Sequence, residues 1–192
     1  MTVSPPSAQE RATLTRIGYL TVVIAGFVAA ISMSAGHLAS GSWTAIITVA
    51  FALGMAVRYW WVILLLAWPF AIPRVALLLA MWAGLDVVAA NTGDERAWAW
   101  SLAMVFLIGT ATELYNYATR QWVVTAPAFQ RSLRSDHVRG AASAAIATAA
   151  MVAVLVTSPR YAPAFAAGLA AIDWVRLAEM VRRHRRFLET SI

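Results

Sequence analysis

The sequence predicts an all-α protein, a polytopic transmembrane helix bundle of about six spans with both termini in the cytoplasm. The first observation behind this prediction is composition: 61% of the 192 residues are hydrophobic and only 12% are charged. Soluble chains carry about 45–50% apolar and about 25% charged residues. A water-soluble fold of this size has too much surface to hide so many apolar side chains. Lipid is therefore expected to cover that surface.

The second observation is a series of long apolar segments separated by short turns. A spanning helix needs about 20 mostly apolar residues. We expect spans at residues 17–37, 43–72, 75–90, 97–118 and 140–157, and a sixth from about residue 164 that continues past the membrane as a charged helix. The chain then divides into a polar cytoplasmic N-terminal segment (1–16), a six-helix transmembrane domain (17–181) and a basic cytoplasmic tail (182–192).

The third observation is the distribution of arginine, which supplies all 15 positive residues of the chain. With the N-terminus in the cytoplasm, only Arg96 and Arg160 lie on the outer side of the membrane. Positive residues in short loops favour the cytoplasmic side. The asymmetry therefore predicts an even number of spans, with Asp94 and Pro159 facing outward and with cysteines introduced at Thr92 and Ser158 open to labelling from outside. The cytoplasmic arginines are Arg11, Arg16, Arg74, Arg120, Arg131, Arg134, Arg139, Arg182, Arg183, Arg185 and Arg186.

The segment 58–74 allows two interpretations that both keep six spans. The second helix can run long and tilted with Arg58 buried inside it. Alternatively it ends near Arg58, and the aromatic residues that follow lie along the cytoplasmic interface, which Trp and Tyr favour. Pro69 and Pro73 oppose a continuing helix, but the uniformly apolar stretch 62–67 leads us to prefer the long helix.

Charged groups inside a membrane are costly, so each is a candidate functional residue. The candidate intramembrane polar site comprises Arg58, Asp86, Glu113, Tyr117, Asp173 and Arg176.

Each candidate also has a structural interpretation. Asp86, close to the outer end of its span, is equally explained as an interfacial residue. Glu113 shares a helix face with Tyr117 and Arg120 and is expected to pair there. Local pairing also explains Asp173 and Arg176, which stand three residues apart.

Arg58 has no opposite charge within one helical turn of its own segment. If it is buried, it requires a carboxylate from another helix, and Glu113 or Asp173 could provide one. This predicted ion pair could serve a function or hold the helices together.

Small residues recur every four positions on the fifth segment, at Gly140, Ala144 and Thr148. Such a face lets helix backbones approach closely. The sixth segment is comparably rich in Ala and Gly, so we expect these two helices to pack against each other. Leu155 is expected to face lipid.

The chain lacks the residues that several kinds of chemistry require. The chain has no Cys, and it has no Lys to form a Schiff base or to bind nucleotide phosphates. The histidines His37, His137 and His184 lack metal-ligand spacing, and we expect them on loops and the tail. No hydrolase elbow or phosphate loop is present. We therefore expect no metal and no cofactor, and no catalytic residue is assigned.

Three function classes remain. Ranked first is a non-catalytic subunit, scaffold or accessory component that acts through helix packing and a basic cytoplasmic face. The second is a small transporter or channel with a polar path lined by Arg58, Asp86, Glu113 and Asp173. The third is an integral-membrane enzyme on a lipid or isoprenoid substrate, with Glu113 or Asp86 as acid and with Trp82 and Tyr117 shaping an apolar pocket.

Partners and location follow from the same pattern. The basic face predicts attraction to anionic lipids, in a bacterial cytoplasmic membrane. The small-residue helices allow a membrane protein partner or a homo-oligomer. Nucleic acid is not expected, because aromatic residues do not interleave the arginines. The direction of the carboxylates discriminates the classes: a water-accessible cavity favours transport, a lipid-open apolar pocket favours an enzyme, and dispersal favours a component.

Overall fold

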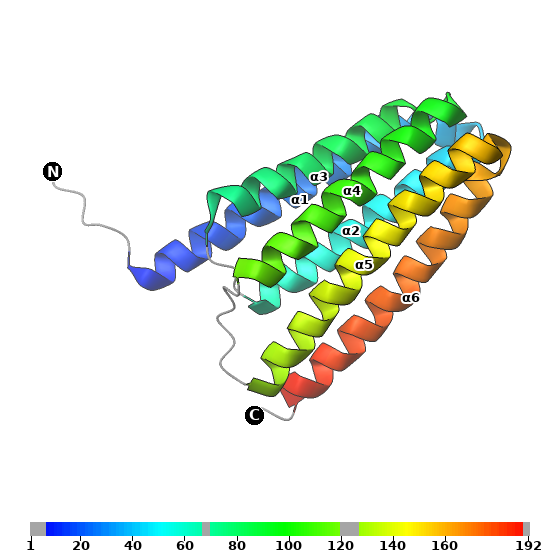
Figure 1. Ribbon diagram of the computed structural model, residues 1–192. Helices are drawn as coiled ribbons and strands as arrows, with labels where there is room; N and C mark the ends of the chain where they lie inside the picture. Colours follow the sequence, from blue (N-terminus) through cyan, green and yellow to red (C-terminus); the bar gives the residue numbers. More distant parts are fainter. Residues whose placement is uncertain (1–6, 67–69, 120–126, 190–192) are drawn as a thin grey trace, which may run out of the picture.

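A computed structural model describes residues 7–66, 70–119 and 127–189. All regular secondary structure in these ranges is helical. The elements are α1 (Ala8–Ala39), α2 (Trp43–Leu66), α3 (Ile72–Ala90), α4 (Glu95–Thr119), α5 (Pro127–Thr157), the short 3-10 helix η1 (Pro159–Tyr161) and α6 (Ala162–Glu189). Consecutive helices run in opposite directions, so α1 begins and α6 ends at the same end of the bundle (Figure 1).

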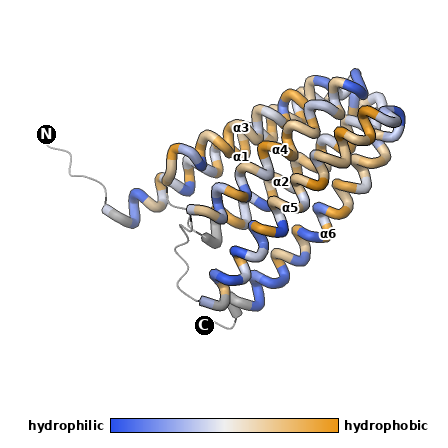
Figure 2. Tube along the Cα trace, in the orientation of Figure 1, coloured by the Kyte–Doolittle hydropathy of each residue, from blue (hydrophilic) through white to orange (hydrophobic). Residues whose placement is uncertain are grey.

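The helices form a closed ring rather than a simple row. Sequence neighbours pack together along α1–α2, α3–α4, α4–α5 and α5–α6, and two non-consecutive pairs, α1–α3 and α2–α6, complete the circuit. The order around the ring is α1, α3, α4, α5, α6, α2. We name the end where α5 begins and α6 ends the polar end, because hydrophilic residues gather on both helices there (Figure 2). The end that carries the turns at 40–42, 91–94 and 158–161 is the turn end.

Local signals explain the helix boundaries. Ser7 and Glu10 form a reciprocal capping box that starts α1, satisfying amides that have no partner within the helix. Pro73 lies in the first turn of α3, where its missing N–H costs nothing. The Asp94 carboxylate accepts hydrogen bonds from the amides of Arg96 and Ala97 at 3.0 Å and so caps α4.

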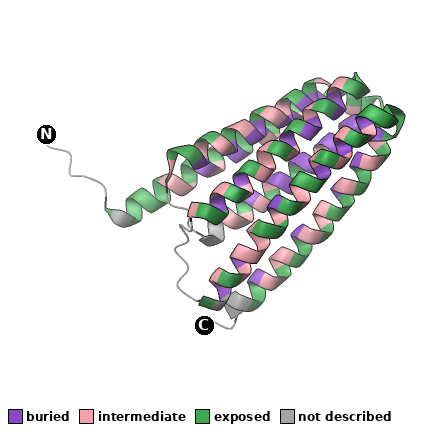
Figure 3. Ribbon diagram, in the orientation of Figure 1, coloured by how far each residue is buried: buried purple, intermediate pink, exposed green. Residues whose placement is uncertain are grey.

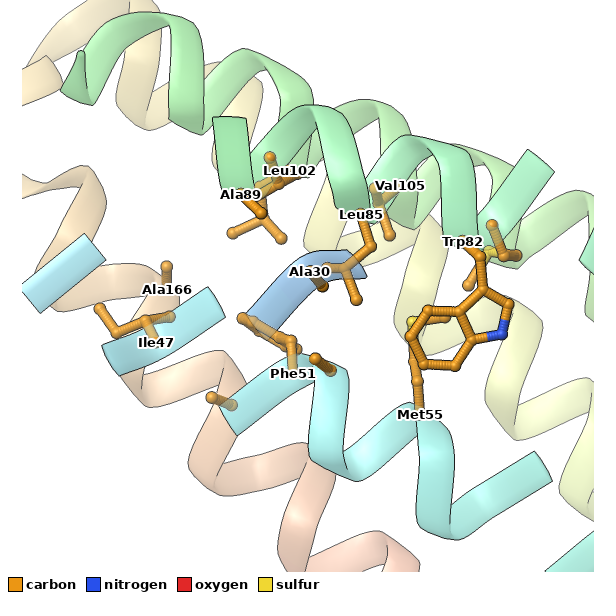
Figure 4. Close-up of a cluster of buried hydrophobic side chains, with 14 of the residues drawn as sticks. Ala30, Ile47, Phe51, Met55, Trp82, Leu85, Ala89, Leu102, Val105 and Ala166 are labelled. Carbon is orange, nitrogen blue, oxygen red and sulfur yellow. The ribbon is translucent and has the colours of Figure 1, made fainter. Parts of the chain in front are cut away.

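The core joins α1, α2, α3 and α4 through large apolar side chains (Figure 4). Trp82 and Met55 face one another there, with Leu85, Phe51 and Ala30 close by. The approach of α1 to Trp82 depends on Gly26. A Cβ atom at Gly26 would lie 2.5 Å from two carbons of the Trp82 side chain.

The outward faces of the helices are exposed yet apolar, as Figures 2 and 3 show together. Ile146 is 68% and Val156 73% exposed. Such a surface is too apolar for water but suits lipid. Among the described residues, five helices, α1 to α5, are long and apolar enough to cross a membrane. The sixth, α6, carries Asp173, Arg176 and Glu179 within its first eighteen residues.

The turn end is tightly packed. Trp98 is completely buried and donates from Nε1 to the Thr48 hydroxyl at 2.8 Å. The Thr44 hydroxyl donates to the carbonyl oxygen of Thr92 at 2.6 Å. Such hydrogen bonds between helices satisfy polar groups that lipid cannot solvate. Thr92 itself is only 3% exposed.

The described helices settle several expectations. The long second helix is confirmed, because α2 continues through Arg58 to Leu66; Pro69 lies outside the described residues. The basic stretch before residue 140 is not wholly a loop, since α5 already begins at Pro127. The sixth segment continues as a charged helix to Glu189, as predicted.

One packing expectation was confirmed only in part, and another was wrong. α5 and α6 do pack against each other, but the small-residue face of α5 lies against α4. A Cβ at Gly109 would contact Ala144, and one at Gly140 would meet Glu113, both across the α4–α5 contact. Leu155 does not face lipid: its side chain is only 7% exposed and belongs to the core. Periodicity identified a face for close packing, but it could not say which neighbour the ring would supply.

Candidate functional site

A cavity of about 230 Å³ lies among α2, α4, α5 and α6. Its inner part is apolar, with Phe51, Met55, Leu102 and Phe106 on the wall. Toward the polar end its lining becomes charged. The charged and histidine residues that line it are Arg58, Glu113, Asp136, His137, Arg139, Asp173, Arg176, Glu179, Arg183 and His184.

The innermost charges are an ion pair between α2 and α6. Arg58 donates from Nη2 to Oδ1 of Asp173 at 2.5 Å. The side chains remain 30% and 29% exposed, because both line the cavity. The predicted cross-helix ion pair is confirmed, and Asp173 is the partner that hydrogen-bonds Arg58.

A second pair joins α4 to α5. His137 Nδ1 lies 2.5 Å from Oε2 of Glu113. Gly140, one turn further along α5, makes room for it: a Cβ at that position would lie 2.9 Å from Glu113 Cδ. The small-residue face of α5 therefore serves to admit a carboxylate between two closely packed helices.

The third group joins α5 to α6 near the polar end. Asp136 pairs with Arg183 at 3.0 Å and with His184 Nε2 at 3.3 Å. His184 is 1% exposed, and its other ring nitrogen lies 3.3 Å from Trp61 Nε1 on α2. Phe129 packs edge-to-face on the same imidazole. His184 of α6 is thus held by side chains of two other helices, α2 and α5.

These groups link the helices around the cavity in pairs. Asp136 and His137 are adjacent in α5 and reach α6 and α4, respectively. Arg58 on α2 reaches α6 through Asp173. Asn116, which also lines the cavity, accepts a hydrogen bond from the buried Arg74 of α3 at 3.3 Å. Each wall of the cavity is therefore joined to a neighbouring helix by a polar contact.

Four of the six predicted site residues line this cavity: Arg58, Glu113, Asp173 and Arg176. Asp86 and Tyr117 do not. Asp86 lies on α3 with a buried Oδ1 that has no hydrogen-bond partner among the described residues, and Tyr117 is 40% exposed.

The local pairings expected for two of these residues differ in the structure. Asp173 pairs with Arg58 and not with Arg176. Glu113 pairs with His137; Arg120, its expected partner, lies outside the described residues.

Sequence reasoning missed Asp136, His137 and His184 as site residues. It placed these histidines on a loop and a tail, whereas they lie on α5 and α6. Pro127 was the available signal, because proline favours the first turn of a helix. A helix started there would have placed Asp136 and His137 on faces of a continuous α5.

The arrangement suits charge recognition more than metal binding. Among the described residues, no three His, Asp or Glu side chains come close enough to hold a metal ion. His37 lies apart, beside Gly93 at the turn end. Arg139 and Arg176 line the cavity without an ion pair or hydrogen bond to any described residue.

Comparison with known proteins gives no family for this chain: no family model, no curated protein and no solved structure matches it.

Proposed function

We propose that this protein is a small membrane transporter that takes up its substrate in the cavity among α2, α4, α5 and α6. The observation that carries the proposal is the convergence of Arg58, Glu113 and Asp173, from three helices, on one cavity. Charges within a membrane protein typically face the bundle interior and mark substrate or ion pathways. The convergence favours transport over the accessory component that ranked first from the sequence.

The two ends of the cavity also fit a transport cycle. Toward the polar end the lining reaches the exposed residues Arg139 and Glu179. Toward the turn end it stops at Phe51 and Leu102, above which Trp98 and its neighbours are fully packed. A site open to one side and closed to the other is the form expected for one state of alternating access.

The enzyme hypothesis has less support. A paired Glu113 and His137 could in principle exchange a proton with a substrate. However, the two side chains expected to shape an apolar reaction pocket, Trp82 and Tyr117, are not among those that line the cavity. The wall is built instead around charge pairs between helices.

The proposal includes six spans with both termini and the polar end in the cytoplasm. α6 is the proposed span that carries Asp173, Arg176 and Glu179, and the Arg58–Asp173 pair supports its insertion because each charge neutralises the other. The basic segments on α5 and α6 then lie where positive residues are retained, next to anionic lipid.

Cysteine labelling tests this topology in a chain that has no cysteine of its own. We expect Glu95→Cys and Arg160→Cys to react with a membrane-impermeant thiol reagent in intact cells, because both positions are exposed at the turn end. Position 95 is used for labelling in preference to position 92, because the side chain of Thr92 is buried. Arg131→Cys should react only after the membrane is opened. The reverse pattern would contradict the orientation.

Transport itself is tested by Ser143→Cys, which places a thiol in the cavity wall. Alternating access predicts reaction with impermeant reagents both in inside-out vesicles and, more slowly, in intact cells. Ala45→Cys, fully buried at the turn end and outside the cavity lining, should react in neither. Reaction of Ser143→Cys from the cytoplasmic side alone would overturn the transport proposal.

A further inference from the structure

We propose that the ligand of this cavity is an anionic amphiphile, with its charged group between Arg139 and Arg176 and its apolar chain against Phe51, Met55 and Leu102. The inference rests on the cavity assigned above to transport and names the substrate class. It follows from which charges in the wall are already neutralised, from the apolar inner half, and from the volume.

Most of the charges in the wall are already paired. Asp173 is neutralised by Arg58, Glu113 is held by His137, and Asp136 is held by Arg183 and His184.

Three charged groups of the lining have no ion pair among the described residues: Arg139, Arg176 and Glu179. Over the whole lining, with neutral histidines, four arginines stand against four carboxylates. What distinguishes the open groups is that two of the three are guanidiniums without an ion pair. Guanidinium groups bind phosphate and carboxylate through paired N–H donors. Arg139 and Arg176 therefore offer a site for an anion.

The residues around the polar end of the cavity also favour an anion. Further arginines lie on the same ends of α5 and α6, among them Arg131, Arg134 and Arg182. A concentration of one sign of charge around a cleft raises the local concentration of the opposite ion. An anion would therefore be drawn to the polar end before it meets the cavity.

The inner half of the cavity does not suit a small inorganic anion. Its wall there is built from Phe51, Met55, Leu102, Val105 and Phe106. Such a surface offers no hydrogen bond to a phosphate ion, but covering it with apolar atoms lowers the free energy. The 230 Å³ volume equals about eight water molecules at roughly 30 Å³ each. It can hold a medium-length alkyl or prenyl segment.

The test uses decyl phosphate as the probe, added to the purified protein in neutral maltoside detergent. We expect it to raise the thermal unfolding temperature with a saturable dose dependence, as a ligand of the folded state does. Decyltrimethylammonium, which has the same chain and the opposite charge, should give no such saturation. Inorganic phosphate should bind at least about tenfold more weakly, because it covers no apolar wall. Equal stabilisation by the cationic probe would overturn the proposal.

Matched variants locate the two halves of the ligand. Arg139→Gln together with Arg176→Gln should weaken decyl phosphate by about tenfold or more, whereas Arg131→Gln, exposed on α5 outside the lining, should not. Ala147→Phe, in the inner wall, should weaken decyl phosphate but leave inorganic phosphate unchanged. An effect of Arg131→Gln as large as that of the double variant would also sink the assignment.

Mass spectrometry of the purified protein distinguishes two sources of such a ligand. A co-purifying phospholipid that disappears in the Arg139→Gln, Arg176→Gln variant identifies a membrane lipid. Decyl phosphate binding without retained lipid identifies a soluble amphiphile. This test and the transport test can fail separately. If decyl phosphate binds but Ser143→Cys is labelled from one side only, the transport proposal is wrong and the ligand class stands. If Ser143→Cys is labelled from both sides but decyl phosphate does not bind, transport stands and the ligand class is wrong.

Discussion

Replacing Arg58 with alanine is expected to destabilise the folded protein by roughly 2–4 kcal/mol, near the cost of breaking buried ion pairs. The Asp173 carboxylate, which Arg58 now neutralises across 2.5 Å, would be left unpaired between α2 and α6. The expected loss is smaller than for a fully buried ion pair, because about a third of each side chain is exposed to the cavity. Thermal unfolding in detergent, with folded yield as a second readout, measures the loss.

A double-mutant cycle separates the ion pair from other effects of the substitution. Asp173→Asn added to Arg58→Ala should recover part of the loss, because it removes the stranded charge, with a coupling energy of roughly 1–3 kcal/mol. Glu113→Gln should show weaker coupling, because Glu113 pairs with His137 and not with Arg58. Arg96→Ala, exposed at the turn end, is the control and should change stability by less than about 0.5 kcal/mol. Strict additivity with Asp173→Asn would show that the pair does not hold α2 to α6.

Gly26→Ala is the second large effect, and a single methyl group causes it. The added Cβ would lie 2.5 to 2.7 Å from three side-chain carbons of Trp82, closer than carbon atoms can pack. Trp82 is 2% exposed and cannot move aside without disturbing the core of α1, α2, α3 and α4. We expect a loss of about 2–3 kcal/mol, typical of overpacked cores, visible as a lower unfolding temperature.

Two other glycines of the same helix provide the controls for Gly26. Nothing lies within 4 Å of a Cβ at Gly18 or Gly36. Alanine favours helix over glycine by about 0.8–1 kcal/mol, so Gly18→Ala and Gly36→Ala should be neutral or stabilising. Trp82→Leu should relieve much of the Gly26→Ala defect. Equal losses at all three glycines would mean that backbone freedom, and not the contact with Trp82, requires glycine at position 26.

The sequence predicted where the helices lie, but it predicted less well which faces of the helices pack against each other. Apolar length located the helices because a spanning segment must be continuous. The need of Arg58 for a carboxylate followed from charge alone, and it led to Asp173. The small-residue face of α5 was also recognised, but it was assigned to α6, one of its two neighbours in the chain. The more extensive packing of α5 is with α4, the other neighbour, and periodicity alone does not choose between the two.

The candidate site was predictable only where a charge interrupted an apolar run. Arg58, Glu113 and Asp173 stand out for that reason. Asp136, His137 and His184 sit among other polar residues, so nothing in composition distinguishes the ones that turn inward. Their role depends on the helical register of α5 and α6 and on a partner from another helix. Single-sequence reasoning has no access to that information.

The closed ring has a consequence for biosynthesis. Arg58 and Asp173 are 115 residues apart, and α6, which carries Asp173, is made after the other five helices of the ring. At about 5–20 residues per second, roughly 6 to 23 s pass between the synthesis of the two partners. In the proposed six-span arrangement, α2 must therefore wait in the membrane with an uncompensated guanidinium, which water or lipid headgroups have to solvate. Arrival of α6 ends that wait and closes the ring in the same step, so the final stage of assembly is also the one that neutralises the interior.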